Sequence, residues 1–261
     1  MRRMRWFAAL ALGIAMVAIA AGCAGSGEDP APGSGSTSAE VSVPPEKTRT
    51  LTADTLPTRI GTTWEVSSRE TETPIDMSVE GPWTFETGPD WRVDEHEIVD
   101  PASAPGIESF SDVTFVVRNV NEGATYYYPR RVTDEWLLHL GRIEVKGDQV
   151  AVEPLQKPSN FWPLGLEVGK EYVVQDEGTF LIEATVLAHN TATTPAGVVE
   201  DVYLVRFVYT PQSEGAEGSV YYYMFAPDVG FVALVHPSAG DEAGGFTGAD
   251  SISVITRLPQ Q

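Results

Sequence analysis

The sequence predicts an all-β fold, built as a curved antiparallel sheet or half-barrel. Its strongest segments, at residues 112–120, 179–187, 202–209 and 219–225, are rich in β-branched and aromatic residues. Gly, Pro, Asn and Asp bound them, which is typical of strands and their turns. The chain has one cysteine and therefore no internal disulfide, so a hydrophobic core must stabilise the domain. A third observation is an internal similarity that predicts two related halves.

The segment 202–209 predicts that the sheet is curved or covered on both sides. Alternation places Tyr203 and Phe207 on one face and Val202 and Leu204 on the other, so both faces are substantially apolar. A flat sheet with one solvated face would show a polar set on one side. Residues 132–140 are the one stretch that could form a helix instead, but the stretch is short.

Two pairs of segments resemble each other along the chain. Residues 56–66 and 164–174 share a glycine followed three positions later by an aromatic residue, Gly61 with Trp64 and Gly169 with Tyr172. The tyrosine triplets at 126–128 and 221–223 form the second pair. This similarity predicts two halves, about 50–150 and 151–261. Chance similarity among β-rich segments is the alternative.

Residues 1–22 have the layout of a bacterial lipoprotein signal peptide. Three arginines precede an uncharged run that ends in small residues directly before Cys23. In such signals the cysteine is lipidated and becomes the new N-terminus. The run is shorter than the ~20 apolar residues that span a bilayer. Cleavage after Ala20 without lipidation and retention as an uncleaved anchor are the alternatives.

Residues 23–49 are predicted to form a disordered tether, and residues 50–261 the β domain. The tether is rich in Gly, Ser and Pro and has almost nothing to bury. The chain has a net charge of −20, and removing residues 1–22 takes away arginines but no acids. Nucleic acids and anionic bilayers repel such a surface, so the lipid on Cys23 is the expected link to a membrane. We therefore predict an extracytoplasmic protein, lipid-anchored to the cell membrane or outer membrane.

Three motifs in the second half resemble those of a broad group of uncharacterised bacterial lipoproteins. They are Pro-Leu with Gly-x-x-Tyr in 161–172, Pro-Ala-Gly in 194–198 and Ala-Pro-Asp-Val-Gly in 222–232, with Val198 and Asp228 departing from the family pattern. The resemblance implies a curved antiparallel sheet similar to the LolA/LolB lipoprotein carriers. The motifs are turn chemistry, so no catalytic residue carries over. We expect a type I turn at Pro195 and a positive φ with a bulge at Gly230.

No motif for catalysis, a metal or a cofactor stands out, so we predict a protein that is not an enzyme and needs no cofactor. The histidines lack the spacing of metal ligands; they are His96, His139, His189 and His236. The acidic residues around His96, from Asp90 to Asp100, predict a solvated loop rather than a calcium site. The acidic, glycine-rich residues 240–250 predict a flexible hairpin connection.

The candidate ligand contacts are Tyr126, Tyr128, Tyr221 and Tyr223, which alternation places on common faces of their strands. Aromatic side chains on a concave sheet can stack against a ligand, and packing in the core is the alternative. The sequence thus predicts a non-enzymatic binding or envelope-interaction lipoprotein, with an apolar small molecule or an envelope protein as partner. A hydrolase of envelope polymers and a scaffold lipoprotein without ligand are the alternatives.

Overall fold

The computed structural model describes residues 49–260 apart from 72, 122, 177, 213–217 and 239–244. These residues belong to one unit, Thr48–Gln261, and the predicted fold class is confirmed: the unit is all-β and mostly antiparallel. The strands are β1 (Thr63–Arg69), β2 (Thr73–Ser78), β3 (Trp83–Thr84), β4 (Arg92–Val99), β5 (Phe115–Asn121), β6 (Ala124–Val132), β7 (Trp136–Lys146), β8 (Gln149–Pro163), β9 (Glu171–Asp176), β10 (Phe180–Thr194), β11 (Gly197–Pro211), β12 (Ser219–Ala226), β13 (Gly230–Pro237) and β14 (Gly245–Gln260). Short 3-10 helices are η1 (Ala53–Thr55), η2 (Pro101–Ser103) and η3 (Ile107–Ser109).

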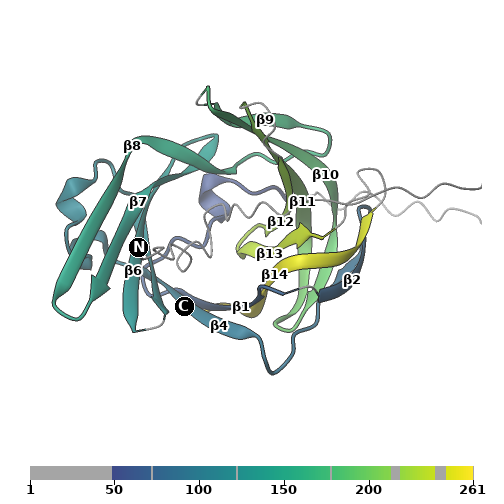
Figure 1. Ribbon diagram of the computed structural model, residues 1–261, viewed down its shortest axis with the longest axis horizontal. Helices are drawn as coiled ribbons and strands as arrows, with labels where there is room; N and C mark the ends of the chain where they lie inside the picture. Colours follow the sequence, from purple (N-terminus) through teal and green to yellow (C-terminus); the bar gives the residue numbers. More distant parts are fainter. Residues whose placement is uncertain are drawn as a thin grey trace, which may run out of the picture. The chain divides into compact units, whose positions relative to one another are not determined.

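All these strands belong to one curved sheet, which is not closed into a barrel (Figure 1). Neighbours follow the order β3-β10-β11-β12-β13-β14-β1-β4-β5-β6-β7-β8, with β2 beside β14 and β9 beside β10. Every pairing is antiparallel except that of β10 with β3. Two runs, β4 to β8 and β10 to β14, each pair consecutive strands, and β1 joins them. The first run extends past the predicted boundary at residue 150, because β8 spans Gln149–Pro163, whereas the second run lies within residues 151–261. A common origin of the halves stays a prediction.

The strands β8 and β9 lie next to each other without a ladder between them. Across this seam, Ser159 Oγ of β8 donates a 3.1 Å hydrogen bond to Gln175 Oε1 of β9. The sequence of β8 suits a strand edge, because Pro154 and Pro158 have no N–H to offer to a ladder. The seam is therefore the place where the sheet stays open.

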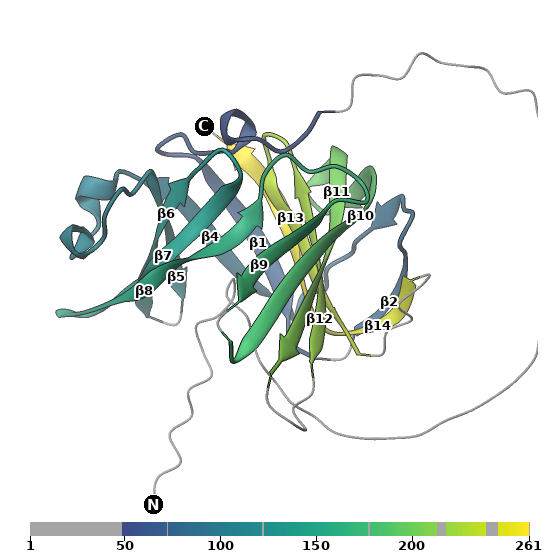
Figure 2. The same cartoon turned by 90° about the horizontal axis from the view of Figure 1, so that it is seen from above.

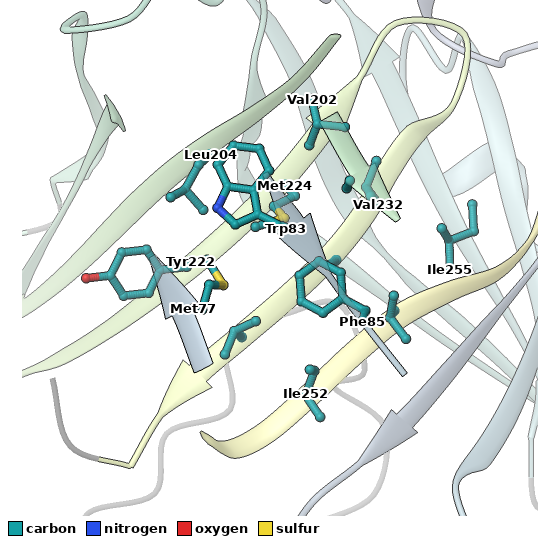
Figure 3. Close-up of a cluster of buried hydrophobic side chains, with 14 of the residues drawn as sticks. Met77, Trp83, Phe85, Val202, Leu204, Tyr222, Met224, Val232, Ile252 and Ile255 are labelled. Carbon is teal, nitrogen blue, oxygen red and sulfur yellow. The ribbon is translucent and has the colours of Figure 1, made fainter. Parts of the chain in front are cut away.

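The two faces of the sheet hold separate cores. The inner-face core joins Leu51 and Leu56, which flank η1, and Leu164 and Leu166 to residues from both runs, among them Phe115, Leu137, Tyr203 and Phe225. The outer-face core lies over β10–β14, where the segment containing β2 and β3 brings Met77, Trp83 and Phe85 against the sheet (Figure 3). Figure 2 shows β2 beside β14 at this end of the sheet.

The apolar character of both faces of segment 202–209 is explained by these two cores. Tyr203, Val205 and Phe207 of β11 face the inner core. Val202 and Leu204 face the outer core. The prediction of a curved sheet covered on both sides at this strand is confirmed.

Most of the stretch 132–140 is in strands, so the helix that the sequence left open as an alternative does not form: β7 begins at Trp136 and pairs with both β6 and β8. One local prediction was wrong. Residues 92–99, within the acidic stretch, form strand β4 rather than a solvated loop. Alternation turns Glu95 and Glu97 outward and buries Asp94 and His96 on the inner face.

The glycine turns have the predicted backbone conformation. Gly61 and Gly169, the equivalent positions of the two similar segments, have φ of +85° and +87°. Gly230 has the predicted positive φ, +74°, but it pairs regularly with Ala226, and the register shift between β12 and β13 lies further along, between Met224 and Phe225. Asp228, which stands where the family pattern has glycine, also has a positive φ, +61°, and its carboxylate pairs with Arg49 at 2.6 Å.

Several predictions lie outside the described residues. These are the signal peptide, the lipidation of Cys23 and all of the tether except Arg49. Residues 240–244 of the predicted connection also lie outside, and the rest of it, residues 245–250, is part of strand β14 rather than a flexible connection, because it pairs with β2 and β13.

Candidate binding site on the inner face of the sheet

The four predicted tyrosines all lie on the inner face of the sheet, in two places. Tyr126 and Tyr128 on β6 stack with ring centroids 6.4 Å apart. Tyr221 and Tyr223 on β12 pack against the inner-face core, where Tyr223 meets the ring of Phe207 at 4.9 Å. The structure thus brings each pair together on its own strand.

A continuous series of aromatic rings connects the two tyrosine pairs. The end of β8 supplies its centre, since Phe161 and Trp162 stack at 5.0 Å. The successive centroid distances are 6.3 Å for Tyr128–His139, 6.1 Å for His139–Phe161, 4.8 Å for Trp162–Phe225 and 5.6 Å for Phe225–Tyr223. Much of the tyrosine surface therefore packs in the core. The candidate ligand-binding groups are those on β6 and β7.

Arg130 of β6 is a buried cation on this face. Its side chain follows Tyr126 and Tyr128 in the same alternation, and the residue is only 3% exposed. Its guanidinium lies over the rings of Phe161, at 4.1 Å from the centroid, and Tyr128, at 5.7 Å. One nitrogen, Nη1, donates a hydrogen bond to His139 Nδ1. Because arginine only donates, His139 carries its proton on Nε2.

None of the described carboxylates forms an ion pair with Arg130. Two neighbouring arginines differ in this respect. Arg92 pairs with the buried Asp94 at 2.9 Å, and Arg142 with Glu153 at 2.8 Å. Burying an arginine costs several kcal/mol unless its charge is compensated. Burial accordingly lowers the pKa of Arg130 to about 9.

Local irregularities of the backbone position Arg130 and its histidine partner. The β6–β7 register shifts between Tyr127 and Arg130, where Pro129 has no N–H for a regular ladder. The β7–β8 register shifts between His139 and Gly141. A Cβ on Gly141, which has φ of +138°, would collide with the backbone of β8. Such bulges reorient single side chains, here the Arg130–His139 pair.

His96 of β4 is the second buried polar group of the cluster. It is 3% exposed, and its ring stacks on Trp64 at 5.2 Å with an interplanar angle of 12°. Its Nδ1 is buried without a hydrogen-bond partner. Burial, and then the charges of Arg130 and Arg92, lower the pKa of His96 to about 4. The imidazole is therefore neutral at pH 7.

The groups beside Arg130 are also neutral at pH 7. Burial, followed by the charges of Arg130 and Arg142, lowers the pKa of His139 far below its ordinary value. Burial raises the pKa of the Tyr128 hydroxyl to about 12. The site thus combines one uncompensated guanidinium with neutral hydrogen-bonding groups and aromatic rings. We call Arg130, His139, His96, Tyr126 and Tyr128 the inner-face cluster.

A pocket of about 230 Å³ lies at the seam between β8 and β9. Ser159 and Gln175 line it, as does Lys157. Ser159 is the cross-strand partner of His139, so the two side chains share one face of the β7–β8 pair. The seam pocket is therefore next to the inner-face cluster.

The sequence alone did not identify Arg130 or the roles of the two histidines. The signal that could have found Arg130 is the alternation itself, because it places Tyr126, Tyr128 and Arg130 on one face. From the sequence, His96 and His139 are candidates only for metal binding, and their spacing does not fit that role. In the part of the chain that the structure describes, no group of three or more His, Cys, Asp and Glu could hold a metal ion. Nor does any helix there have the length and apolar character needed to cross a membrane.

Comparisons with known proteins give one distant likeness. No family model matches the chain, and no curated protein matches it in sequence. A crystal structure of a protein from Parabacteroides distasonis, described as a "putative lipoprotein", is similar with a TM-score of 0.35 and 12% sequence identity. The match covers 80% of this chain and 98% of that chain. At this identity and TM-score, the likeness says nothing about what the present chain binds.

Proposed function

We propose that this protein is a lipid-anchored, extracytoplasmic binding protein of the non-enzymatic type, whose ligand lies on the inner face of the sheet. The anchor is the lipid on Cys23, and the bound molecule contacts the part of the inner face formed by β4, β6 and β7. The observation that supports this most directly is Arg130, a buried cation that forms no ion pair with the carboxylates of the described residues. A protein that needed this position only for packing would be better served by an apolar side chain.

The chemistry of the cluster favours binding over acid–base catalysis. An efficient general base has a pKa near the working pH. The pKa values of His96 and His139 lie well below 7 because both rings are buried near arginines. Because both rings stay neutral at pH 7, each ring nitrogen keeps a fixed role as hydrogen-bond donor or acceptor. Selective binding of a small molecule uses polar groups of this kind.

Two matched variants test the location of the ligand. The full-length protein is extracted from its native envelope and analysed by native mass spectrometry for a co-purifying small molecule. Tyr128→Ala removes a ring from the inner face, whereas Tyr127→Ala removes the neighbouring ring from the outer face, where it packs near Val116 and Ile143. We expect the bound mass to be lost only in Tyr128→Ala. Equal retention in both variants would contradict an inner-face site.

The anchor is tested separately on the same preparation. Intact mass should show a diacylglyceryl group and an N-acyl chain on residue 23. Cys23→Ser should move the protein from the membrane fraction to the soluble extracytoplasmic fraction, because one or more acyl chains supply its membrane affinity. A Cys23→Ser protein that stays with the membrane would refute the lipid anchor.

A further inference from the structure

The positive charge of the inner-face cluster is not balanced by a negative charge among the described residues. Arg130 brings a positive charge into an almost fully buried position, and the groups it contacts among the described residues are neutral: the ring nitrogen of His139 and the faces of Phe161 and Tyr128. Ring faces offset part of the cost of burying a guanidinium, by roughly 0.5–2 kcal/mol each. A carboxylate or phosphate offsets more, because it accepts two parallel N–H bonds from the planar fork.

A second group points to the same kind of ligand. His96 Nδ1 is buried and has no hydrogen-bond partner. An unsatisfied buried nitrogen costs about 1–3 kcal/mol, which an acceptor atom of a ligand would recover from an Nδ1–H tautomer. The charge of Arg130 acts on His96, so the two groups share one electrostatic environment. They lie on the same face of the sheet, His96 on β4 and Arg130 on β6.

The surroundings of the guanidinium are apolar and aromatic. Tyr126 and Tyr128 stack beside it on β6, and Phe161 covers it from β8. Such rings bind hydrocarbon well and offset only part of the cost of burying the charge. The ligand that suits this surface therefore has an anionic head and an apolar body. A metal ion is disfavoured, because Arg92, Arg130 and Arg142 raise the positive potential here.

The seam gives a route for such a molecule. Between β8 and β9 no ladder hydrogen bonds have to be broken, and the seam pocket already occupies about 230 Å³ there. Lys157 and Asp176 both line that pocket, so its lining carries one charge of each sign. The first inner-face neighbour beyond Ser159 is His139, which bonds Arg130.

We infer that the inner-face cluster binds the carboxylate or phosphate head of an amphiphilic molecule through Arg130 and His96, with the apolar body against Tyr126, Tyr128 and Phe161 and with entry at the β8–β9 seam. This inference rests on the proposed function and names its ligand class. Fatty acids and alkyl or lipid phosphates share the required chemistry, and the experiment separates them.

The test measures binding of octanoate, octyl phosphate and octanol to the full-length protein in neutral detergent at constant ionic strength. Tryptophan fluorescence reports on Trp64, which stacks on His96, and thermal unfolding gives a second reading because a ligand of the folded state raises Tm. We expect at least one of the anions to bind about tenfold or more tightly than octanol. One hydrogen bond to a charged group accounts for a difference in affinity of this size. Whichever of the two anions binds more tightly identifies the source of the head group.

Variants of adjacent arginines sharpen the result. Arg130→Met should remove the preference for the anion over octanol, and Arg130→Lys should restore part of it, because lysine keeps the charge without the fork. Arg131→Met is the matched control: Arg131 donates to Ser111 O at 2.7 Å and pairs with Asp112, away from the cluster. It should keep the anion preference of the unmodified protein.

The outcomes separate the two proposals. Octanol binding as tightly as both anions would overturn the anionic head group while leaving an inner-face ligand in place. Anion binding that survives Arg130→Met would overturn the role of Arg130. Absence of binding by all three probes at millimolar concentration would overturn both this inference and an amphiphilic ligand for the proposed function. Since the comparison of probes uses the unmodified chain, it decides the question even if a variant fails to fold.

Discussion

The two tyrosine triplets are alike in sequence but lie in different surroundings. In the first run, β4 to β8, the central Tyr127 faces outward and is only partly buried, and the inner face carries His96, Arg130 and His139. In the second run, β10 to β14, the central Tyr222 is 2% exposed beneath Met77 and Trp83. In the second run the tyrosine triplet thus lies in a strand that is buried on both faces. In the first run it lies in a strand whose inner face carries polar groups.

The difference comes from what covers the outer face. The segment with β2 and β3 lies over β10–β14, so these strands can be apolar on both sides (Figure 3). Over β4–β8 the outer face has only the small cluster around Val116 and Ile143. We infer that the second run supplies most of the stability and that the first run is the one free to carry polar, incompletely satisfied groups. Functional surfaces are commonly placed on the less stable part of a domain.

The largest change in stability should come from weakening the β2–β3 segment that covers the outer face of β10–β14. Trp83→Ala should lower the free energy of unfolding by about 3–5 kcal/mol, because it deletes a buried indole that is 2% exposed. Val150→Ala, on the uncovered first run, should change it by less than about 0.5 kcal/mol, since Val150 is 48% exposed. Urea denaturation with unchanged m values measures both. Similar losses in the two variants would contradict the contrast between the runs.

Acid should destabilise the first run. His96 has a pKa near 6.5 when unfolded and about 4 when folded, so between these values the unfolded chain binds more protons. Stability should therefore fall as the pH drops from about 6.5 to about 4, by on the order of 3 kcal/mol from His96 alone. Unfolding free energies at pH 7, 6, 5 and 4 measure this slope. His96→Phe, which can keep the stack on Trp64, should make the slope shallower without removing it, because the buried His139, whose pKa is also lowered, destabilises the fold in acid in the same way. An unchanged slope would refute the assignment.

The central tyrosines of the triplets provide the most direct comparison. Tyr222→Ala should cost about 2 kcal/mol more than Tyr127→Ala, because the ring it removes is buried under the β2–β3 segment. Both variants are compared with the unmodified chain by thermal and urea unfolding. Equal costs would mean that the two outer faces are equally well packed.

The smallest effect concerns the turn after β12. Asp228→Gly removes an exposed ion pair with Arg49 and at the same time relieves the positive φ of a non-glycine residue. These contributions oppose each other, and each is below about 1 kcal/mol, so the free energy of unfolding should change by less than that. Chemical denaturation resolves such a difference. A loss of several kcal/mol would show that the Arg49 contact anchors the start of the domain.

Local rules were sufficient for the strands and turns. Alternating β-branched and aromatic residues identified the strands at 202–209 and 219–225, because burial on a pleated surface imposes a period of two. Glycines predicted the turns at Gly61, Gly169 and Gly230, because few other residues accept a positive φ. Those rules left a helix open at residues 132–140 and failed around His96. The choice between helix, loop and strand there depends on pairing with distant strands, and the polar residues Asp94 and His96 gave no sign that their side of β4 is buried.

The sequence by itself determined the all-β class, the tyrosine-bearing strands and the conformation of the turns, since each depends on residues close together in the chain. It also contains the signal-like segment ending at Cys23, whose lipidation stays a prediction. Only the tertiary structure decided that β2 and β3 cover one run, that the sheet stays open between β8 and β9, and that Arg130 lies buried beside His139 with no ion pair to a carboxylate in the part of the chain that the structure describes. These features depend on contacts between strands that are distant along the chain, and alternation within one strand does not specify what lies opposite it.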